Sequence, residues 1–433
     1  NGQSLHHLNL GGVQGTVSNN ILNGSDIGVT LANACGNLTV ASNTFTNMHR
    51  AAQDLLNGDY AAGILLFSPQ FSGPISITGN TFTSNDSGIR SSSYPGGTWT
   101  GSGMTIAGNT FSGNLYDIVS KYPLSELVLS GSNVLNGKTL STQTTNELIA
   151  TGDKISDKVD VTAYGLVRTK AANVYVSSSN TVANGIAAAS AGDTVNVAAG
   201  SYAENLTISK PLTLDGAGSG STKVTGTTGS IILVTGSNVT ISDLQVEGPV
   251  GSSPTVGILF NTAVSNITVT NVLASLHQAG IRVDTGAVVS SLAISGTTLT
   301  NCGNGFDMAA TGKASSVSMT NGVISNCLYG MSSTAHVARS DNQDDFTGVT
   351  ITDTTFTNNG VKGLYFEKIN NAVLTNVTVT DTAGAGMSAP AVNGVGMQFN
   401  LMFGAYTAIT VNNPTLTGNG VVGPNGIGLM VAA

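Results

Sequence analysis

Charged residues are scarce in this 433-residue sequence, where Asp, Glu, Lys and Arg together make up only 9%. About a quarter is usual for a soluble domain, so few side chains are available for acid–base catalysis. The formal net charge of −8 argues against nucleic acid as a partner, because binding to phosphates needs a basic face. A weakly acidic surface of this kind indicates a soluble protein.

Cysteine and long apolar runs are also rare. Three cysteines, Cys35, Cys302 and Cys327, are too few for a disulfide framework, so the core has to be held by packing. No run of about 18 apolar residues occurs, and the sequence therefore predicts no membrane span. The chain begins at Asn1 without a Met, a basic segment or an apolar leader, which favours a processed protein or a piece of a longer one.

The sequence does contain an internal repeat. In the first half, an apolar anchor is followed three residues later by Asn and five residues later by an apolar residue. The anchors are Val17, Val40, Ile77 and Ile106, the Asn residues are Asn20, Asn43, Asn80 and Asn109, and the apolar partners are Leu22, Phe45, Phe82 and Phe111. A third apolar position follows at Val29, Ile89 and Ile118. Each unit therefore offers three short alternating strands separated by turns.

The same pattern returns in the second half. Its anchors are Ile241, Val269, Ile294, Met319, Ile351, Leu374 and Val411, and their partners five residues later are Val246, Ala274, Leu299, Ile324, Phe356, Val379 and Leu416. A Gly followed by a large apolar residue closes the unit, as at Gly280–Ile281, Gly305–Phe306, Gly330–Met331 and Gly363–Leu364. The anchors lie about 23 to 29 residues apart where no insertion intervenes, a spacing that matches one coil of a β-solenoid.

Stacking explains why such short strands can fold. One coil has no core of its own, but each strand can pair with its copy about 4.8 Å above and below, and inward side chains then form columns. The sequence therefore predicts an all-β parallel β-helix. We interpret the repeated Asn as a structural ladder, since Asn tolerates left-handed backbone and can bond a neighbouring amide. The Phe residues of the repeat are expected to stack in the same way.

Cys302 and Cys327 occur in two N-C-x-x-G phrases one coil apart, and they are expected to stack as reduced thiols. A disulfide between them is disfavoured, because side chains on stacked coils point in parallel. Zinc would need four ligands, and no His or further Cys lies near them in the sequence.

Composition changes near residue 138 and divides the chain. Residues 1–137 are predicted to be the C-terminal part of a first β-helix. Residues 138–172 hold a concentrated share of the charges and are predicted to form a cap and linker, with a short amphipathic helix over 146–159 and strands. Residues 173–433 are predicted to be a second β-helix with an N-terminal cap and an open C-terminal end. A polar cap suits a solenoid end, because the last coil otherwise exposes a strand edge.

Residues 182–219 resemble the opening of bacterial β-helix proteins of the pectate-lyase-like superfamily. The matching positions are Ala191, Gly192, Asp193, Val195, Val197, Gly200, Tyr202, Glu204, Leu206, Ile208, Lys210, Leu212, Leu214 and Gly216. The resemblance implies a right-handed helix whose first coil is covered by a short α-helix. The passage before it is similar to junctions between tandem modules of large, adhesin-like bacterial surface proteins.

These features favour a structural or adhesive protein of the cell surface or extracellular space, and not an enzyme. Joining the end of the sequence to its start would give uninterrupted coils, so the expected partners are further copies of the chain, arranged head to tail as a filament or within one giant polypeptide. An extracellular polysaccharide or a neighbouring cell surface is a further candidate partner.

The alternative is a polysaccharide-binding or polysaccharide-degrading protein, because the superfamily includes lyases, hydrolases and epimerases. The sequence shows neither a clustered set of acids nor a basic pair beside an acidic pocket of the kind such chemistry requires.

Several charged, His and aromatic groups remain as candidate sites. The loop with His336, Arg339, Asp341, Asp344 and Asp345 offers oxygen ligands for calcium or a sugar, although a solvated loop explains it equally. His277, Arg282 and Asp284 share one coil, where an exposed Arg–Asp ion pair is expected. Trp99 with Tyr94 offers a surface for a sugar ring or for loop packing. His6, His7 and His49 are scattered, and no cofactor is predicted beyond the calcium alternative.

Overall fold

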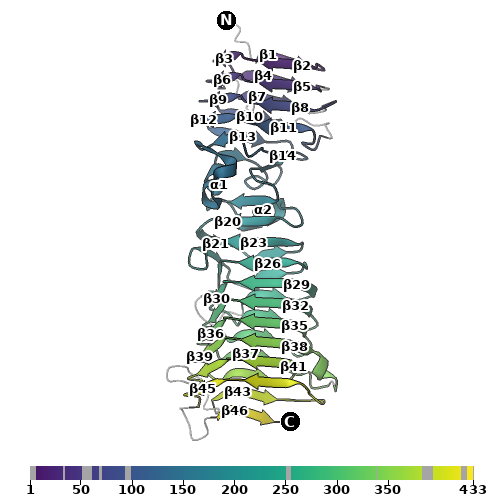
Figure 1. The fold of residues 1–433 in the computed structure, drawn as a ribbon, viewed down its shortest axis with the longest axis vertical. Coiled ribbons are helices and arrows are strands. Elements are labelled where there is room, and N and C mark those ends of the chain that lie inside the picture. The colour runs from purple at the N-terminus through teal and green to yellow at the C-terminus, as the bar shows by residue number, and fades with distance from the viewer. Residues whose placement is uncertain are drawn as a thin grey trace. The chain divides into compact units, whose positions relative to one another are not determined.

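The computed structural model describes residues 6–32, 35–50, 61–67, 71–92, 99–249, 255–338, 340–382, 394–420 and 427–432. The chain divides into two compact units, Asn1–Ala198 and Ala199–Ala433. Each unit is built as a right-handed parallel β-helix, in which the chain passes through three sheets in every coil (Figure 1). The all-β solenoid predicted from the repeat is thereby confirmed.

In unit 1 the successive strands of a coil belong to sheets A, B and C. Sheet A consists of β1 (His6–Gly11), β4 (Ile27–Ala32), β7 (Ala62–Phe67), β10 (Ser87–Ser91), β13 (Tyr116–Ser120) and β17 (Ile155–Ser156). Sheet B consists of β2 (Gly15–Ser18), β5 (Leu38–Ala41), β8 (Ile75–Thr78) and β11 (Met104–Ala107). Sheet C consists of β3 (Ile21–Asn23), β6 (Thr44–Thr46), β9 (Thr81–Thr83), β12 (Thr110–Ser112), β15 (Val134–Leu135) and β16 (Lys138–Thr139).

The rest of unit 1 is less regular. It contains the parallel pairs β14 (Glu126–Val128) with β18 (Leu166–Arg168), and β19 (Asn173–Val176) with β20 (Thr194–Val197). A 3-10 turn, η1 (Leu140–Thr142), and two short helices, α1 (Thr145–Gly152) and α2 (Val182–Ala188), complete it.

In unit 2 the successive strands of a coil belong to sheets E, F and G. Sheet E runs through β23 (Leu212–Gly216), β26 (Val239–Ser242), β29 (Ala263–Thr270), β32 (Val288–Ser295), β35 (Lys313–Thr320), β38 (Phe346–Thr352), β41 (Asn370–Thr375) and β44 (Ile409–Asn412). Sheet F runs through β21 (Gly200–Ala203), β24 (Thr222–Thr225), β27 (Gln245–Glu247), β30 (Leu273–Ser275), β33 (Thr298–Thr300), β36 (Val323–Ser325), β39 (Thr355–Thr357), β42 (Thr378–Thr380) and β45 (Thr415–Thr417). Sheet G runs through β22 (Leu206–Ile208), β25 (Ser230–Val234), β28 (Val256–Phe260), β31 (Ala279–Val283), β34 (Asn304–Met308), β37 (Tyr329–Ser333), β40 (Lys362–Phe366), β43 (Val395–Asn400) and β46 (Ile427–Ala432), and a 3-10 turn, η2 (Asn342–Asp344), precedes β38.

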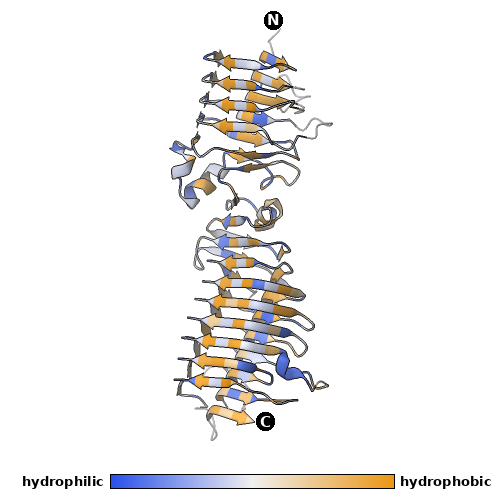
Figure 2. Cartoon of the chain, turned by 45° about the vertical axis from the view of Figure 1, so that its right-hand side comes forward, coloured by the Kyte–Doolittle hydropathy of each residue, from blue (hydrophilic) through white to orange (hydrophobic). Residues whose placement is uncertain are grey.

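The repeat predicted from the sequence matches the strand register. Every anchor of the first half pairs with the next, as do the partners five residues later. The anchors and partners of the second half pair in the same way through β44 and β45. Apolar and polar residues alternate along these strands (Figure 2), so that each coil contributes the same positions to the core.

The core therefore consists of columns of like side chains. Phe45, Phe82 and Phe111 are almost fully buried, and their rings stack with centroids 5.0 and 4.8 Å apart and planes within 7° and 12° of parallel. Full burial of such a side chain is worth about 1.5 to 3 kcal/mol. Because each ring also contacts a copy of itself, the column fixes the register of the coils above and below.

The left-handed backbone that we expected at the ladder Asn residues lies one residue earlier. The positive φ angles belong to Asn19, Ser42, Gly79 and Gly108, at 60°, 55°, 63° and 63°. These residues turn the chain from sheet B to sheet C. The Asn that follows is then free to keep its side chain in line with the coil axis, where it can bond the next coil.

The segment predicted as cap and linker contains a shorter helix than expected. Helix α1 starts at Thr145 with a capping box between Thr144 and Glu147, and it ends at Gly152 instead of Val159. The chain then adds β17 to β13 through the pair Ile118–Ile155, so strand pairing takes over where the helix was expected to continue. The domain limits 1–137, 138–172 and 173–433 stay a prediction. Among the residues described, no helix has the length and apolar character to span a membrane.

Candidate functional site

The outer face of sheet G carries an extended group of polar and aromatic side chains in the described part of unit 2. One column holds, in register, Arg282, Asp307, Ser332, Tyr365 and Gln398. The neighbouring column holds Asn304, Tyr329 and Lys362. We call these eight residues the G-face cluster. Strand alternation places the first column outward, because the residues beside it on each strand, Ile281, Phe306, Met331, Leu364 and Met397, are buried in the core. Asn304, Tyr329 and Lys362 are the first residues of β34, β37 and β40, and each is partly exposed.

The first half of the G-face cluster is a hydrogen-bonded network around Asp307. Asn304 Nδ2 and Ser332 Oγ donate to Asp307 Oδ1 at 2.8 and 3.1 Å. Arg282 Nε lies 3.5 Å from Asp307 Oδ2 and 3.3 Å from Asp284 Oδ1. These contacts hold the carboxylate and the guanidinium in place before any ligand arrives.

The second half is aromatic. The rings of Tyr329 and Tyr365 lie 5.9 Å apart, tilted by 47°. The Tyr365 hydroxyl donates to Glu367 Oε1 at 2.6 Å and accepts from Asn400 Nδ2 at 3.3 Å. Burial, reinforced by the Glu367 carboxylate, raises the pKa of Tyr365 to about 12, so this phenol is a proton donor and not a base at neutral pH. Burial also lowers the pKa of Lys362, which favours the neutral amine.

One atom of the G-face cluster is left with unused hydrogen-bonding capacity. Gln398 Oε1 is shielded from solvent and has no hydrogen-bond partner within the described residues. Arg282 Nε is also shielded and lacks hydrogen-bond geometry, but it is ion-paired with Asp284 and Asp307. Buried polar atoms are nearly always satisfied, so such exceptions call for a water molecule or a ligand. An unused acceptor beside two Tyr rings on the same face suits a polar molecule with hydroxyl groups and apolar ring faces.

The predicted ladder residues lie in the turns and core of unit 1, away from any such face. Asn43, Asn80 and Asn109 are buried, and each Oδ1 accepts from the backbone N and side-chain Nδ2 of the preceding ladder Asn at 2.9 to 3.1 Å. Asn133, which the sequence analysis did not include, extends the ladder beyond Asn109. This arrangement is structural and leaves these amides no capacity for a ligand.

Cys302 and Cys327 are free and buried, and they lie one coil apart. Each thiol donates to the carbonyl oxygen two residues earlier, at 3.3 Å. The two sulfurs also interact with each other, and together with burial this raises the pKa of the Cys327 thiol above its usual range. A thiol held protonated in this way is a poor nucleophile and a poor metal ligand.

The calcium candidates lie in the loop that leads to β38. Asp345 is fully buried and faces two lysines, with Lys313 Nζ at 3.0 Å and Lys368 Nζ at 3.8 Å from its oxygens. Lys368, which is also buried, donates to the carbonyl oxygens of Ala309, Ala310 and Gly312. The Asp345 carboxylate thus has cationic side chains where a calcium ion was considered. Within the described residues no three His, Cys, Asp or Glu side chains group closely enough to hold a metal, and Arg339 lies outside those residues.

His277 is a structural residue in the interior. Its Nδ1 lies 3.1 Å from Thr255 Oγ1 and its Nε2 lies 3.1 Å from the Val246 carbonyl oxygen, which indicates Nε2–H as the donor. Burial lowers the pKa of His277 to about 4, so the ring is neutral. Arg282 and Asp284 do form the expected ion pair, but Arg282 also reaches Asp307 on the next coil.

The other candidates are dispersed over unit 1. Trp99 is buried and packs edge-to-face on Phe71, with ring centroids 5.3 Å apart. Tyr94 lies outside the described residues, as do the side-chain contacts of His6. His49 pairs with Asp86 at 2.8 Å on the surface, and His7 is exposed.

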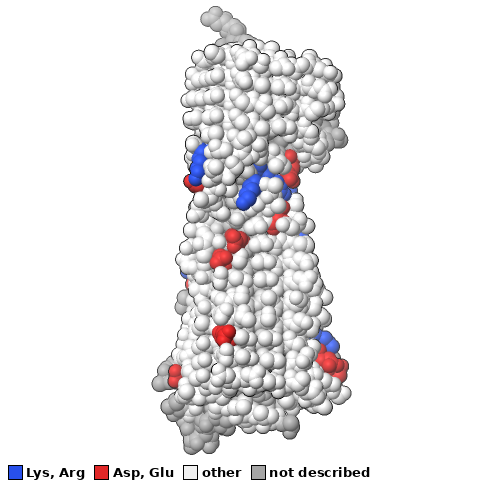
Figure 3. Space-filling view, in the orientation of Figure 1, with Lys and Arg blue, Asp and Glu red and all other residues white. Residues whose placement is uncertain are grey.

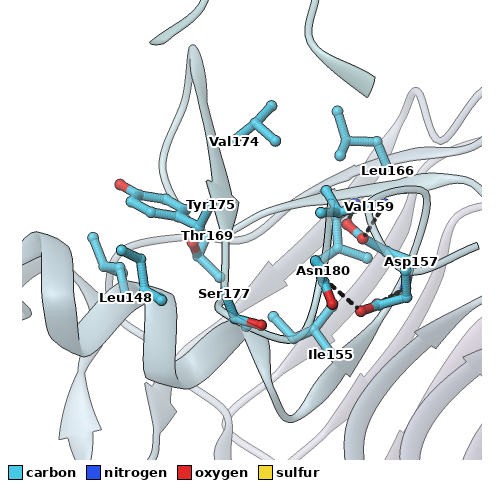
Figure 4. A pocket seen from close by; sticks show the side chains of 14 residues that line it. Leu148, Ile155, Asp157, Val159, Leu166, Thr169, Val174, Tyr175, Ser177 and Asn180 are labelled. Carbon is cyan, nitrogen blue, oxygen red and sulfur yellow. Dashed lines mark hydrogen bonds between the residues drawn. The ribbon is translucent and has the colours of Figure 1, made fainter. Parts of the chain in front are cut away.

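Unit 1 also contains a small cavity that could not be predicted from the sequence. Its space of about 30 Å³ is enough for about two water molecules. Figure 4 shows apolar side chains such as Leu148, Ile155 and Val174 around it, with Asp157 on one side. Burial raises the pKa of Asp157 to about 7, although its oxygens accept from the Val159 and Val167 amides at 2.8 Å. The cavity is too small for a substrate, so we regard Asp157 as structural.

The molecular surface agrees with the scarcity of charge in the sequence. Figure 3 shows one face on which nearly all atoms belong to uncharged residues, with a few Asp, Glu, Lys and Arg side chains in small groups. A ligand that binds this face would therefore be recognised mainly by uncharged groups.

A scan of protein-family models and a search of curated proteins found no match to the chain. Among solved structures, an alginate lyase from Paenibacillus sp. str. FPU-7 aligns with 60% of this chain and 98% of its own, at 13% identity and a TM-score of 0.36. The A-module of a mannuronan C-5 epimerase from Azotobacter vinelandii aligns with 56% and 89%, at 11% identity and 0.25. A pectin methylesterase from Aspergillus niger aligns with 42% and 78%, at 16% identity and 0.21. These TM-scores are too low to indicate an activity for this chain. The β-helix fold is shown by the register of its paired strands.

Proposed function

We propose that this chain is an extracellular β-helix that binds a polysaccharide along the G-face cluster. The observation that carries the proposal is the buried acceptor Gln398 Oε1, which has no hydrogen-bond partner within the described residues and lies in the same outward column as Tyr365. A sugar chain supplies hydroxyl groups that can both donate and accept, and ring faces that can pack on Tyr329 and Tyr365. Strands about 4.8 Å apart would present these groups to successive sugar units.

Binding is tested with a panel of neutral and uronate oligosaccharides by titration calorimetry on the whole chain. Tyr365→Ala removes a ring and the partner of Glu367, and Gln398→Ala removes the unsatisfied acceptor. Each is expected to weaken binding about tenfold, equal to about 1.4 kcal/mol. Tyr116→Ala is the matched control, because Tyr116 is an exposed tyrosine of unit 1, 38% accessible. Equal affinity of wild type and Tyr365→Ala for every bound sugar would refute the proposal.

A second candidate function is elimination on a uronate polysaccharide, which Lys362 specifically favours. Abstraction of the proton next to a uronate carboxylate needs a base that is neutral near working pH. The lowered pKa of Lys362 moves this amine in that direction, and it lies one coil from Tyr329 in register. Lys362→Gln is expected to abolish any ultraviolet-absorbing unsaturated product while weakening binding no more than Tyr365→Ala does. Absence of such product from wild type on every uronate polymer would leave binding as the function.

Adhesion and assembly with further copies of the chain stay predictions. The low surface charge and the stacked coils support a structural element outside the cell, where a polysaccharide-binding face would attach it to a matrix. Electron microscopy of native material tests assembly, since head-to-tail contacts predict filaments and isolated particles contradict them.

A further inference from the structure

The outer face of sheet F carries a two-dimensional array of threonines that the G-face cluster does not include. One column consists of Thr298, Val323, Thr355, Thr378 and Thr415, and the other of Thr300, Ser325, Thr357, Thr380 and Thr417. We call these positions the F-face array. Their side chains are half-buried or exposed, while the residue between the two columns on each strand points into the core.

The F-face array is regular in both directions. Neighbouring strands lie about 4.8 Å apart, and residues two apart on a strand are separated by about 6.8 Å. Hydrogen bonds hold hydroxyls of the second column in line, between Thr300 Oγ1 and Ser325 Oγ and between Thr380 Oγ1 and Thr357 Oγ1, each at 2.9 Å. These bonds fix the side-chain rotamers, so the hydroxyl and methyl groups repeat with the strand spacing.

Unit 1 carries the same pattern independently on sheet C. Its two columns are Thr44, Thr81 and Thr110, and Thr46, Thr83 and Ser112. They overlie the stacked Phe45, Phe82 and Phe111, whose ring separations of 5.0 and 4.8 Å give the coil spacing directly. Each of the two sheets thus presents the same surface lattice within its own unit over a different core, which points to a ligand with a matching lattice.

The composition of the F-face array also needs a cause beyond strand propensity. Threonine is favoured in strands, but so are valine, tyrosine and isoleucine. Charged residues are also tolerated on a solvent-exposed face of a sheet. No array position is charged, whereas earlier coils of the same sheet carry a Lys223–Glu247 pair at 3.0 Å. The same coils also carry Lys362 and Asp307 on sheet G, so these coils tolerate charge on another face.

We infer that the F-face array, together with its counterpart on sheet C, binds ice. Water oxygens on a prism face of hexagonal ice repeat in two perpendicular directions at distances close to the strand spacing and the two-residue spacing. Each threonine offers a hydroxyl that donates and accepts and a methyl group that orders adjacent water. A charged partner would find no opposite charge on the array, and a sugar chain would find no aromatic ring. The inference does not depend on polysaccharide binding at the G-face cluster.

The test measures thermal hysteresis and inhibition of ice recrystallisation by the whole chain. The array variant combines Thr83→Lys, Thr357→Lys and Thr380→Lys, because a long charged side chain in the lattice keeps an ice surface away. The control variant combines Thr105→Lys, Thr240→Lys and Thr350→Lys, which place the same change on sheets B and E. Circular dichroism checks the fold of both.

Thermal hysteresis in wild type and control, with loss in the array variant, is the expected result. Absence of hysteresis and of recrystallisation inhibition in wild type would overturn the inference without any variant. Equal loss in the control, or none in the array variant, would overturn the assignment to these faces. If the triple variant does not fold, Thr357→Tyr alone tests the same point with an uncharged obstruction, and it is expected to reduce the hysteresis.

Discussion

Removing one asparagine from the middle of the ladder should destabilise unit 1 far more than removing the terminal one. Asn80 Oδ1 accepts from Asn43 N and Nδ2 at 3.0 and 3.1 Å, and Asn80 Nδ2 donates to Val40 O at 2.8 Å. Asn80 Nδ2 also donates to Asn109 Oδ1 at 3.0 Å, so Asn80→Ala leaves two buried donors and two acceptors without this partner. Each such loss costs about 1 to 3 kcal/mol, so we expect about 3 to 5 kcal/mol in total after partial relaxation.

Asn20→Ala is the matched control. Asn20 is exposed, and its side chain only donates within the described structure, to Ser18 O at 3.0 Å and to Asn43 Oδ1 at 2.9 Å. Removing this side chain leaves no buried donor without a partner, so we expect Asn20→Ala to lower the free energy of unfolding by about 1 kcal/mol or less. Urea unfolding followed by the fluorescence of Trp99 measures both variants, because this single Trp lies in unit 1 and is 7% exposed. Equal shifts of the midpoint for the two variants would refute the ladder as a source of stability.

Two buried titratable groups give opposite pH dependences. Burial lowers the pKa of His277 to about 4 in the folded protein. As the pH falls, His277 is therefore protonated in the unfolded chain before it is protonated in the folded one. Unit 2 should lose about 3 kcal/mol of stability between about pH 6.5 and pH 4. His277→Gln should flatten this loss in urea titrations followed by circular dichroism, and an unchanged slope would contradict it. Asp157 has a pKa raised to about 7 by burial, so stability is full below about pH 4 and unit 1 should lose about 4 kcal/mol as pH rises to 7. Asp157→Asn should remove this dependence of the Trp99 midpoint on pH, and a wild-type slope in the variant would show that another group is responsible.

The columns of the core could be predicted because the spacing of apolar residues within a single coil is enough to identify their positions. The spacing between an anchor and its partner five residues later is set by one short turn. The positions of Val40 and Phe45 in their coil could therefore be predicted from that coil alone. The third sheet was harder to place in the coil interrupted by an insertion. There Ile64 stacks between Val29 and Ile89, but an insertion in the sequence before Ile64 lengthens its distance from the anchor Val40 beyond the usual twelve residues.

The G-face cluster was missed because it exists only across coils. Tyr329, Lys362 and Tyr365 come from two coils separated by the loop that holds Asp345, and nothing in either stretch alone marks a site. A signal was nevertheless present, since the residue after each Gly–apolar pair belongs to the outward column. Arg282 follows Gly280–Ile281, and Tyr365 follows Gly363–Leu364. The cavity beside Asp157 had no such signal, because it depends on how irregular segments of unit 1 pack.

Hydrogen exchange of the intact chain, followed by mass spectrometry, tests most directly the claim that stacked coils and their side-chain ladders hold this protein together. The amides of Asn43, Asn80 and Asn109 lie in turns but bond the side chain of the next coil. The account predicts that these amides exchange as slowly as those of the flanking strands β5, β8 and β11. Fast exchange at the three Asn amides, with protection confined to the strands, would contradict it.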